Sequence, residues 1–443
     1  MKKKTDVKGG DMKDFACVIL AAGEGTRMNS QTPKVLHTVY KKPLIGYILK
    51  ALEELKIKKV ITVCGYKSKQ VAGYLGKKSL IVEQKRRLGT ADALRQAEKK
   101  LAGFKGHILT LCADIPLIRS QTLNRLIALH RGSKASCTVL TSVLKNPTGY
   151  GRILRDDNNK VVKIIEEKDA SLYEKVIEEI NSGVYCFKAK DLFASLKEIK
   201  ADNAKKEYYL TDIIEIFAKK ELSISSFETE DTEEILGINS RFDLVEAHKI
   251  IRKRILARVI EGGVTIVDPE TTHIDNNVEI GQDTVIEPFV RIEEDVKIGK
   301  KCRLGPFLRI RPHTVIADEV KLGNFVEVVR STVDSGTKIN HHTYIGDSRI
   351  GKKVNVGAGT ITANYNGREK NTTIIKDNAF IGSGSILVAP VKIGKNAVTG
   401  ANCTVVKGEV KDDTVVVGVP AKVLRKKKKQ KQVSKSVKPR SRK

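Results

Sequence analysis

The chain has 443 residues, and at roughly 100 to 200 residues per domain it is expected to form two or three domains. With 40% apolar and 30% charged residues, its composition excludes a disordered or fibrous protein. The net charge is +29, but residues 422–443 hold twelve basic residues and no acid, which leaves +17 for the rest. Such an excess favours anionic partners without choosing among nucleotides, sugar phosphates and nucleic acid.

The seven cysteines are scattered, and none forms a C-x-x-C pair. This pattern argues against a disulfide framework and against a zinc cluster, and it fits a reducing compartment. The apolar run that begins at Phe15 stops at Gly23, which is too short for a signal peptide or a membrane span. We therefore expect a cytoplasmic protein without a membrane span.

The first half of the chain alternates between strand-like and helical segments. Strands are predicted at 15–20, 59–64 and 107–112, with helices that begin at Pro43 and after Gly89. This order predicts a Rossmann-like α/β domain with a mostly parallel sheet. Ligands of such sheets bind beyond the carboxyl ends of the strands, which places the loop 21–27 and Asp114 on one rim.

The loop after the first strand has a composition that suits phosphate binding. Leu20, Ala21, Ala22 and Gly23 lead into a second glycine, Gly25, and glycines allow backbone N–H groups to approach phosphates. Met28 replaces the third glycine of a dinucleotide fingerprint, and no Gly-Lys-Ser/Thr follows, so neither a dinucleotide site nor a Walker loop is supported. Arg27 and Lys34 supply two cations where a triphosphate would lie. Taken alone, a loop of this kind is more often a turn than a binding site.

After a helix predicted at 240–262, the apolar period changes to six. Ten aliphatic residues follow one another at this spacing: Ile274, Ile280, Ile286, Ile292, Ile298, Leu304, Ile310, Ile316, Leu322 and Val328. The register then slips and resumes at Val333 and Ile375. A period of six fits neither a helix nor a plain strand, but it fits hexapeptide repeats with one short strand and one corner each. Three hexads give an 18-residue coil, so residues 264–420 predict eight or nine coils.

This pattern resembles the left-handed parallel β-helix of the hexapeptide acyltransferases, which are usually trimers. The handedness and the homotrimer are implied by that resemblance. An alternative is that the solenoid serves only as a scaffold.

The motifs of the first half resemble the sugar-1-phosphate nucleotidyltransferases. They occur in this order: LAAGEGTRM with PKVLH (20–37), Gln84 with LGTA (88–91), ADIPL (113–117), GYGRI (149–153), IEEKDA (165–170), NSG (181–183) and GINSR (237–241). Together with the hexads, they resemble the family of bifunctional N-acetylglucosamine-1-phosphate uridylyltransferase/glucosamine-1-phosphate N-acetyltransferases. The resemblance covers residues 15–420 and implies an enzyme of UDP-N-acetylglucosamine synthesis, which serves cell-wall and lipopolysaccharide formation.

The resemblance implies a role for several residues of the first half. UTP would be bound by Leu20, Ala21, Ala22, Gly23, Lys34, Gln84, Gly89 and Thr90, and N-acetylglucosamine-1-phosphate by Gly151, Glu166, Asn181 and Asn239. Asp114 and Asn239 would hold Mg²⁺, since hard oxygen ligands suit this ion. An acid after a strand can also simply cap the next helix. The sugar phosphate would attack the α-phosphorus of UTP and expel pyrophosphate, with Arg27 and Lys34 neutralising charge.

In the hexad region, His341 lies two places after an inward aliphatic residue, where side chains are expected to leave the coil. Acetyl transfer from acetyl-CoA to the amine of glucosamine-1-phosphate needs a base, and imidazole suits neutral pH. The resemblance implies His341 as this base, oriented by Glu327. It also implies sugar-phosphate binding by Arg311, Tyr344, Asn355, Asn364 and Tyr365, and acetyl-CoA binding by Ala358, Ser383 and Ala401. The spacing to His313 or His273 does not reproduce the zinc ligands of the carbonic anhydrases built on this fold.

Two positions depart from the family pattern. Val329 stands where the family usually has a lysine for the sugar phosphate, and Gly418 stands where an arginine is expected near acetyl-CoA. Arg330, or Lys422 and Arg425, are candidates to replace the lost contacts. Unless these residues replace the lost contacts, we expect weaker substrate binding in the acetyltransferase domain or a changed acceptor.

The predicted organisation is an N-terminal extension (1–14), a uridylyltransferase domain (15–239), a linker helix (240–262), an acetyltransferase domain (263–421) and a basic, disordered tail (422–443). One alternative is an enzyme with the first activity only. Another is an added binding of RNA or an anionic surface through the tail. The tail has no interleaved aromatic residues for base stacking, so nucleic acid is not the expected partner.

Overall fold

The computed structural model describes residues 12–426, and the chain divides into two compact units at Ile251/Arg252. The helix α8 (Arg241–Glu261) contains this division and matches the helix predicted at 240–262. In the described part of the chain, no helix has the length and apolar content needed to span a bilayer.

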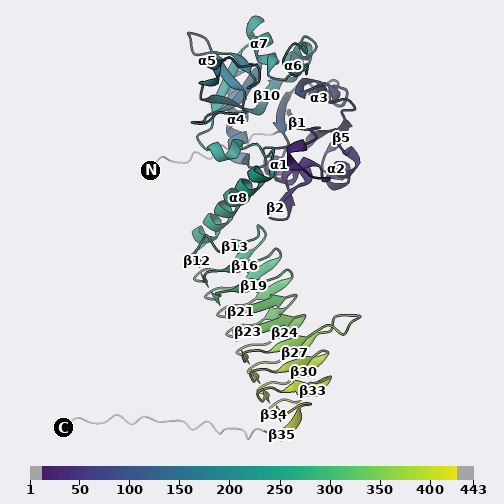
Figure 1. Ribbon diagram of the computed structural model, residues 1–443, viewed down its shortest axis with the longest axis vertical. Helices are drawn as coiled ribbons and strands as arrows, with labels where there is room; N and C mark the ends of the chain where they lie inside the picture. Colours follow the sequence, from purple (N-terminus) through teal and green to yellow (C-terminus); the bar gives the residue numbers. More distant parts are fainter. Residues whose placement is uncertain (1–11, 427–443) are drawn as a thin grey trace, which may run out of the picture. The chain divides into compact units, whose positions relative to one another are not determined.

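The first unit is built on a nine-stranded sheet with the central order β11-β7-β10-β6-β1-β4-β5 (Figure 1). These strands are β1 (Phe15–Ala21), β4 (Lys59–Cys64), β5 (Leu80–Glu83), β6 (His107–Cys112), β7 (Cys137–Val143), β10 (Glu179–Lys188) and β11 (Ile224–Glu228), while β8 (Arg152–Arg155) and β9 (Val161–Ile165) extend the sheet beside β10. Only β10 runs antiparallel to its two central neighbours. The mostly parallel α/β sheet is confirmed.

Helices cover both faces of this sheet. Successive side chains of β1 point to opposite sides, and both sets are apolar, so each face packs against helices. Phe15, Cys17 and Ile19 belong to one apolar core, and Ala16 and Val18 to the other. The first core includes residues of α1 (Leu44–Glu54), α2 (Ser68–Leu75) and α4 (Ser120–Ser133), and the second those of α3 (Thr90–Gln96), α6 (Ala189–Leu196) and α7 (Asp212–Lys219). Shorter elements are η1 (Thr26–Met28), η2 (Lys34–Leu36), β2 (Thr38–Val39), β3 (Lys42–Pro43), η3 (Glu98–Leu101), α5 (Leu172–Lys175) and η4 (Thr232–Ile235).

The sheet topology predicts where a ligand binds. From β1 the chain first adds β4 and β5 on one side and then returns to place β6 on the other side. Such a reversal leaves a crevice at the carboxyl ends of the two strands that flank it. Here the crevice lies after Ala21 and Cys112, where the glycine loop and Asp114 follow.

The second unit is a stack of parallel coils with three faces (Figure 1). The first face holds β12 (Thr265–Ile266), β15 (Val285–Ile286), β18 (Arg303–Leu304), the first halves of β21 (Lys321–Val329) and β23 (Lys338–Gly346), β25 (Asn355–Val356), β28 (Phe380–Ile381), β31 (Val398–Thr399) and β34 (Thr414–Val417). The second face holds β13 (His273–Ile274), β16 (Val290–Ile292), β19 (Leu308–Ile310), the second halves of β21 and β23, β26 (Ile361–Ala363), β29 (Ile386–Val388) and β32 (Thr404–Val405). The third face holds β14 (Glu279–Ile280), β17 (Val296–Ile298), β20 (Thr314–Ile316), β22 (Thr332–Val333), β24 (Ser348–Ile350), β27 (Thr373–Ile375), β30 (Val391–Ile393) and β33 (Gly408–Val410).

The strand pairing confirms the 18-residue coil. Ile274 pairs with Ile292 and Ile286 with Leu304, one coil further along the chain. The slip in the hexad register is a coil that is one residue shorter, because Leu322 pairs with Ile339. All ten hexad positions are buried except Ile280, which is half-buried. Between Ile350 and its partner Ile375, seven extra residues form a loop that projects from the stack (Figure 1).

Both predicted terminal segments differ in part from the structure. Met12 is buried in the first core and Asp14 forms an ion pair with Arg131, so the end of the predicted extension packs on the sheet. At the other end, β35 (Lys422–Lys426) pairs antiparallel with β34, so the first five residues of the predicted tail form a strand. The rest of that tail lies outside the described residues.

Candidate functional site

A cavity of about 520 Å³ lies at the crevice beyond β1 and β6. Its lining contains every residue predicted to bind the nucleotide, namely Leu20, Ala21, Ala22, Gly23, Lys34, Gln84, Gly89 and Thr90. Asp114 lines the same cavity. The structure thus brings together residues that are up to 94 positions apart in the sequence.

The glycine loop closes tightly over Lys34. Gly25 has a φ of +70°, and a Cβ placed on it would lie 2.6 Å from the Cβ of Lys34. Any other residue would therefore be strained in its backbone and would also clash. Gly23 is exposed and lines the cavity, and a Cβ on it would meet nothing within 4 Å.

Lys34, Asp114 and Asn239 form one cluster. The Nζ of Lys34 donates to Oδ2 of Asp114 at 2.7 Å and to Oδ1 of Asn239 at 3.1 Å. Asn239 is fixed by its backbone, since its N–H and that of Ser240 both donate to the carboxylate of Asp243 at 2.8 Å. Two oxygens from distant parts of the chain are thus turned toward the same positive charge.

This oxygen pair is compatible with magnesium. Among residues 12–426 there is no group of three or more His, Cys, Asp or Glu side chains that could enclose a metal ion. Mg²⁺ usually takes one or two protein oxygens and completes its shell with water and substrate phosphates. Asp114 and Asn239 supply this number of ligands and already converge on a cation.

The residues predicted at the uracil lie at the start of α3. Gln84 is buried, and its Nε2 donates to the carbonyl of Gly89 at 3.1 Å and to Asp92 Oδ2 at 2.7 Å. Gly89 has a φ of +111°, and a Cβ there would lie 2.4 Å from the carbonyl oxygen of Tyr208. Thr90 accepts a hydrogen bond from the N–H of Leu210 at 2.9 Å. These contacts fix Gln84, Gly89 and Thr90 at one rim of the cavity.

Of the residues predicted at the sugar, Gly151, Glu166 and Asn181 lie near one another, whereas Asn239 belongs to the Lys34 cluster, and none of the four is part of the cavity lining. The N–H of Asn181 donates to the carbonyl of Gly151 at 2.9 Å, next to an irregularity in β10 between Asn181 and Tyr185. Glu166 accepts a hydrogen bond from Thr211 at 3.1 Å, and burial raises its pKa. Burial also raises the pKa of the Cys112 thiol to about 12, with Asp114 and Glu166 adding to the shift, so this cysteine is a neutral wall and not a nucleophile.

Arg27 is not brought to the cavity. It is exposed on η1 and is absent from the cavity lining. Besides Lys34, the cation that lines the cavity is Arg87, which forms an ion pair with Glu24 of the glycine loop. Sequence reasoning missed Arg87, Glu24 and Glu207. Arg87 directly precedes the Leu88-Gly89-Thr90 motif, and this position was the available signal.

In the second unit, His341 is exposed, as predicted. It lies on the first corner, which we define as the edge between the first and second faces, and Asn324 is its partner on the preceding coil. The pairing of Ile339, Val356, Ile381 and Thr399 places Ala358, Ser383 and Ala401 at the same point of the following three coils. We call His341, Ala358, Ser383 and Ala401 the corner column. The structure therefore aligns the predicted base with the three predicted acetyl-CoA residues.

The expected contact between Glu327 and His341 is not formed within the chain. Glu327 lies on the second face opposite Tyr344, and its carboxylate accepts a hydrogen bond from Arg311 at 2.9 Å. His341 is three residues before Tyr344 on the same strand, around the corner. Glu327 and His341 do not meet because one lies on the second face and the other on the first corner of the same chain.

Most of the residues predicted at the sugar phosphate lie at the second corner, between the second and third faces. Arg330 forms two hydrogen bonds with Asp347 at 2.6 and 2.8 Å, and this ion pair lowers the pKa of Asp347. Asn364 also donates to Asp347, and Tyr365 is exposed in the projecting loop. Arg311 and Tyr344 lie on the same side, whereas Asn355 is on the first face. The residues predicted to bind the sugar phosphate therefore lie in two places, with the second face between Asn355 and the others.

The two departures from the family pattern have different settings. Val329 is 1% exposed and packs inside the coil, and the neighbouring Arg330 is held by Asp347. Gly418 has a φ of +93°, and its carbonyl accepts from the N–H of Thr404. Lys422 and Arg425 are exposed on β35. Lys370 of the projecting loop also acts on Asp347 and is exposed, so it is a second cation on this side of the coils.

Comparison with known proteins decides the family. The nucleotidyl transferase family matches residues 16–233, and the bacterial transferase hexapeptide family matches residues 277–312 and 372–407. Proteins named Bifunctional protein GlmU are similar over nearly the whole chain. The one from Pelotomaculum thermopropionicum is 44% identical over 86% of this chain and 90% of its own length, and the one from Acetivibrio thermocellus is 42% identical over 89% and 93%. The chain belongs to the GlmU family.

As a GlmU protein, the chain is a bifunctional transferase with a nucleotidyltransferase unit and an acetyltransferase unit of hexapeptide repeats. The Listeria monocytogenes GlmU is 42% identical over 90% of this chain and 94% of its own length. A solved structure of a putative glucose-1-phosphate thymidylyltransferase from Bacillus anthracis aligns with a TM-score of 0.44 at 20% identity, covering 53% of this chain and 94% of that one.

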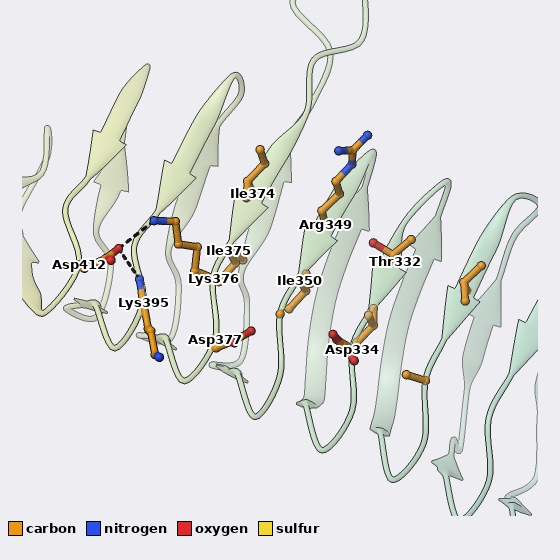
Figure 2. Close-up of a pocket in the computed structure, with 14 residues that line it drawn as sticks. Thr332, Asp334, Arg349, Ile350, Ile374, Ile375, Lys376, Asp377, Lys395 and Asp412 are labelled. Atoms are coloured by element: carbon orange, nitrogen blue, oxygen red, sulfur yellow. Dashed lines mark hydrogen bonds and ion pairs between the residues drawn. The ribbon is translucent and has the colours of Figure 1, made fainter.

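A further cavity of about 620 Å³ lies on the third face of the GlmU coils (Figure 2). Val315 and Ile374 give it an apolar floor, and Arg349 stands beside it. Part of its charged rim is paired within the chain, since Oδ1 of Asp412 accepts from the backbone N–H of Lys395 at 2.8 Å and from Lys376 Nζ at 3.1 Å. None of the predicted site residues lines this cavity.

Proposed function

We propose that the cavity at the glycine loop binds UTP and N-acetylglucosamine-1-phosphate and transfers the uridylyl group between them. The observation that carries this proposal is the position of Lys34 Nζ between Asp114 and Asn239, on the wall of the cavity that Gln84, Gly89 and Thr90 also line. A cation and two oxygen ligands beside a glycine loop suit a triphosphate. Gln84, Gly89 and Thr90 would hold the uracil.

In this reaction, an oxygen of the sugar phosphate forms a bond to the α-phosphorus of UTP. The bond from that phosphorus to the bridging oxygen breaks, and pyrophosphate leaves with the electron pair. Mg²⁺ held by Asp114 and Asn239 would neutralise phosphate charge when bound. Lys34 orients the phosphates and stabilises their charge in the transition state, while Gly151, Glu166 and Asn181 position the sugar. Arg27 lies outside the cavity lining, so Lys34 is the cation assigned to the phosphates.

The magnesium assignment is tested by Asp114→Asn. The expected result is that the Mg²⁺ concentration giving half the maximal rate of pyrophosphate release rises about tenfold or more, because one anionic ligand is lost. Asp157→Asn, at an exposed turn position, is the matched control and should leave this concentration unchanged. An Asp114→Asn variant with the metal dependence of the wild type would remove Asp114 from the metal site.

We also propose that the corner column binds acetyl-CoA and that His341 is the base for N-acetylation of glucosamine-1-phosphate. The amine nitrogen forms a bond to the thioester carbonyl carbon, the carbon–sulfur bond breaks, and coenzyme A leaves as a thiol. His341 takes the proton that the amine loses and passes it on toward the leaving sulfur. The exposed imidazole in line with Ala358, Ser383 and Ala401 supports this assignment.

The acetyltransferase site is proposed to be completed in a homotrimer. Within one chain, His341 is on the first corner, while Arg311, Tyr344 and Asn364 are separated from it by the second face. A small sugar phosphate cannot reach both sets in one chain, so a second copy would bring its second corner to the first corner of its neighbour. A solution mass of three times the chain mass of 49.0 kDa is expected, and a monomer with full thiol release would contradict this arrangement.

A further inference from the structure

Four rings form a continuous stack on the first corner. The stack consists of Phe289, Phe307, Phe325 and His342, with ring centroids 4.8, 5.0 and 4.9 Å apart and interplanar angles of 2°, 7° and 19°. We call these four residues the aromatic ladder. Its spacing equals the distance between neighbouring strands, so each coil contributes one ring.

The aromatic ladder is exposed and rests on an unusual backbone. Its three phenylalanines are between 45% and 53% exposed. All four residues have a positive φ, from +43° at His342 to +60° at Phe289, a region that bulky side chains seldom adopt. The rings are therefore not required by the interior of the coil, and they form a wall on its surface.

The ladder ends at His342. In the same register, the next two coils carry Gly359 and Gly384, with φ of +75° and +71°. The N–H of Gly359 donates to the carbonyl of His342 at 3.1 Å, and the N–H of Gly384 to the carbonyl of Ala358 at 2.7 Å, so the backbone continues without interruption. Because Gly359 and Gly384 have no side chains, no ring of these coils stacks on the far face of the His342 ring.

A track of small residues therefore runs along the first corner and stops at a ring. We define the track by Ala358, Gly359, Ser383 and Gly384, all partly or fully exposed. The predicted base His341 stands directly before His342, at the closed end. A thin, extended ligand laid in this track would have its end beside His341 and against the aromatic ladder.

We propose that the His342 ring, backed by Phe325, is the stop that limits the acyl donor to a short acyl group. The inference rests on the proposed acetyltransferase function and adds the specificity determinant to it. With the pantetheine arm in the track and the thioester carbon at His341, an acetyl methyl fits before the ring, whereas a longer chain meets it. Transfer of a longer acyl group follows the same balance: the amide C–N bond forms, the thioester C–S bond breaks, and the amine proton goes through His341 to the thiol product.

The test compares acetyl-CoA, propionyl-CoA and butyryl-CoA as donors to glucosamine-1-phosphate with the full chain, with thiol release as the readout. His342→Gly extends the glycine pattern of Gly359 and Gly384 by one coil and suits the positive φ. We expect its ratio of kcat/KM for propionyl-CoA to that for acetyl-CoA to rise about tenfold, since one methylene in an apolar site discriminates at about this level. Retained transfer from acetyl-CoA reports whether the coils of the variant are intact, because His342 lies in the second unit.

Two variants serve as matched controls. His342→Phe keeps a ring in the ladder, and its ratio should stay within about twofold of the wild type. Phe289→Ala removes the ring at the opposite end of the ladder, and its ratio should not change. If His342→Gly transfers no acyl group, His342→Asn replaces it, because asparagine tolerates positive φ and has no ring.

The outcomes separate the two proposals. An unchanged donor ratio in the ring-free variants, with acetyl transfer retained, overturns the acyl stop and leaves the proposed function standing. Wild-type thiol release that is unaffected by His341→Ala contradicts the proposed base, whatever the donor ratio. No thiol release by the wild type with any of the three donors overturns both.

Discussion

Lys34 Nζ lies 2.7 Å from Oδ2 of Asp114, although 80 residues separate them in the sequence. The ammonium occupies the space between the two oxygens that are proposed to hold Mg²⁺. Lys34 and the metal are both cations, so they cannot share this place. Binding of the metal with the nucleotide should therefore release Lys34 toward the phosphates.

Replacing Lys34 should slow uridylyl transfer strongly. Removal of one preorganised donor costs about 100-fold to 1,000-fold in kcat, so Lys34→Ala should lose pyrophosphate release by this factor while thiol release stays unchanged. Lys69→Ala, at an exposed lysine of α2, is the control. A rate within threefold of the wild type would remove Lys34 from the mechanism.

Replacing His341 should affect only the other activity. A positioned base contributes about 10²-fold to 10⁴-fold, so His341→Ala should lose thiol release by such a factor and keep uridylyl transfer from N-acetylglucosamine-1-phosphate. His313→Ala, which removes another exposed histidine of the second unit, should change neither rate. Parallel loss of both activities would point to a folding defect and away from a base.

The buried His130, which is paired with the partly buried His107, should make the first unit sensitive to acid. His107 Nδ1 and His130 Nε2 are 3.0 Å apart, and His130 Nδ1 is 2.9 Å from Thr138 Oγ1. Burial, His107, Lys188 and Arg131 lower the pKa of His130 to about 3. The unfolded chain binds a proton near pH 6.5 that the folded protein excludes, so stability is fully present above about pH 6.5 and is lost as the pH falls toward 3.

This sensitivity is measurable as a slope. Between about pH 6 and pH 4, His130 should contribute a loss of up to ~1.4 kcal/mol in the free energy of unfolding per pH unit. His130→Asn should flatten the slope of the first unit in denaturant titrations, while His313→Asn leaves it as in the wild type. Equal slopes for the wild type and His130→Asn would show that the pair is not the acid-sensitive element.

Close contact between coils makes Gly323 intolerant of a side chain. A Cβ there would lie 2.0 Å from the carbonyl oxygen of Asn340, so β21 and β23 would have to move apart. Gly323→Ala should destabilise the coils by about 3 kcal/mol or more and speed hydrogen exchange at the amides of β21 and β23. Gly73→Ala in α2, where a Cβ meets nothing within 4 Å, should not destabilise the protein.

Two kinds of element could be predicted well from the sequence: strands with continuous apolar runs, and coils with a repeated apolar spacing. The runs at 59–64 and 107–112 are strands with these bounds, and the hexads give the coil length, because burial of every aliphatic residue dictates these patterns. The strand β35 was missed, since Lys422–Lys426 carries basic residues typical of a solvated tail and becomes a strand only through pairing with β34.

The sequence predicted which residues of the candidate site lie in the loops at the carboxyl ends of the strands. Gln84, Gly89, Thr90 and Asp114 were placed at one cavity, as expected. The pairing of Lys34 with Asp114 and Asn239 depends on tertiary distances that no motif encodes. Within one chain Glu327 does not meet His341, because a motif gives order along the chain, whereas the corner of a coil decides which side chains of that chain meet.

The row of coils has one more consequence. Each coil touches only the coil before it and the coil after it, so no contact returns from the last strands to the first. Loosening that starts at the last described coils therefore reaches Ala401 and Ser383 before it reaches His341. Partial heating should first weaken the proposed binding of acetyl-CoA, while His341 still lies in the ordered strand β23.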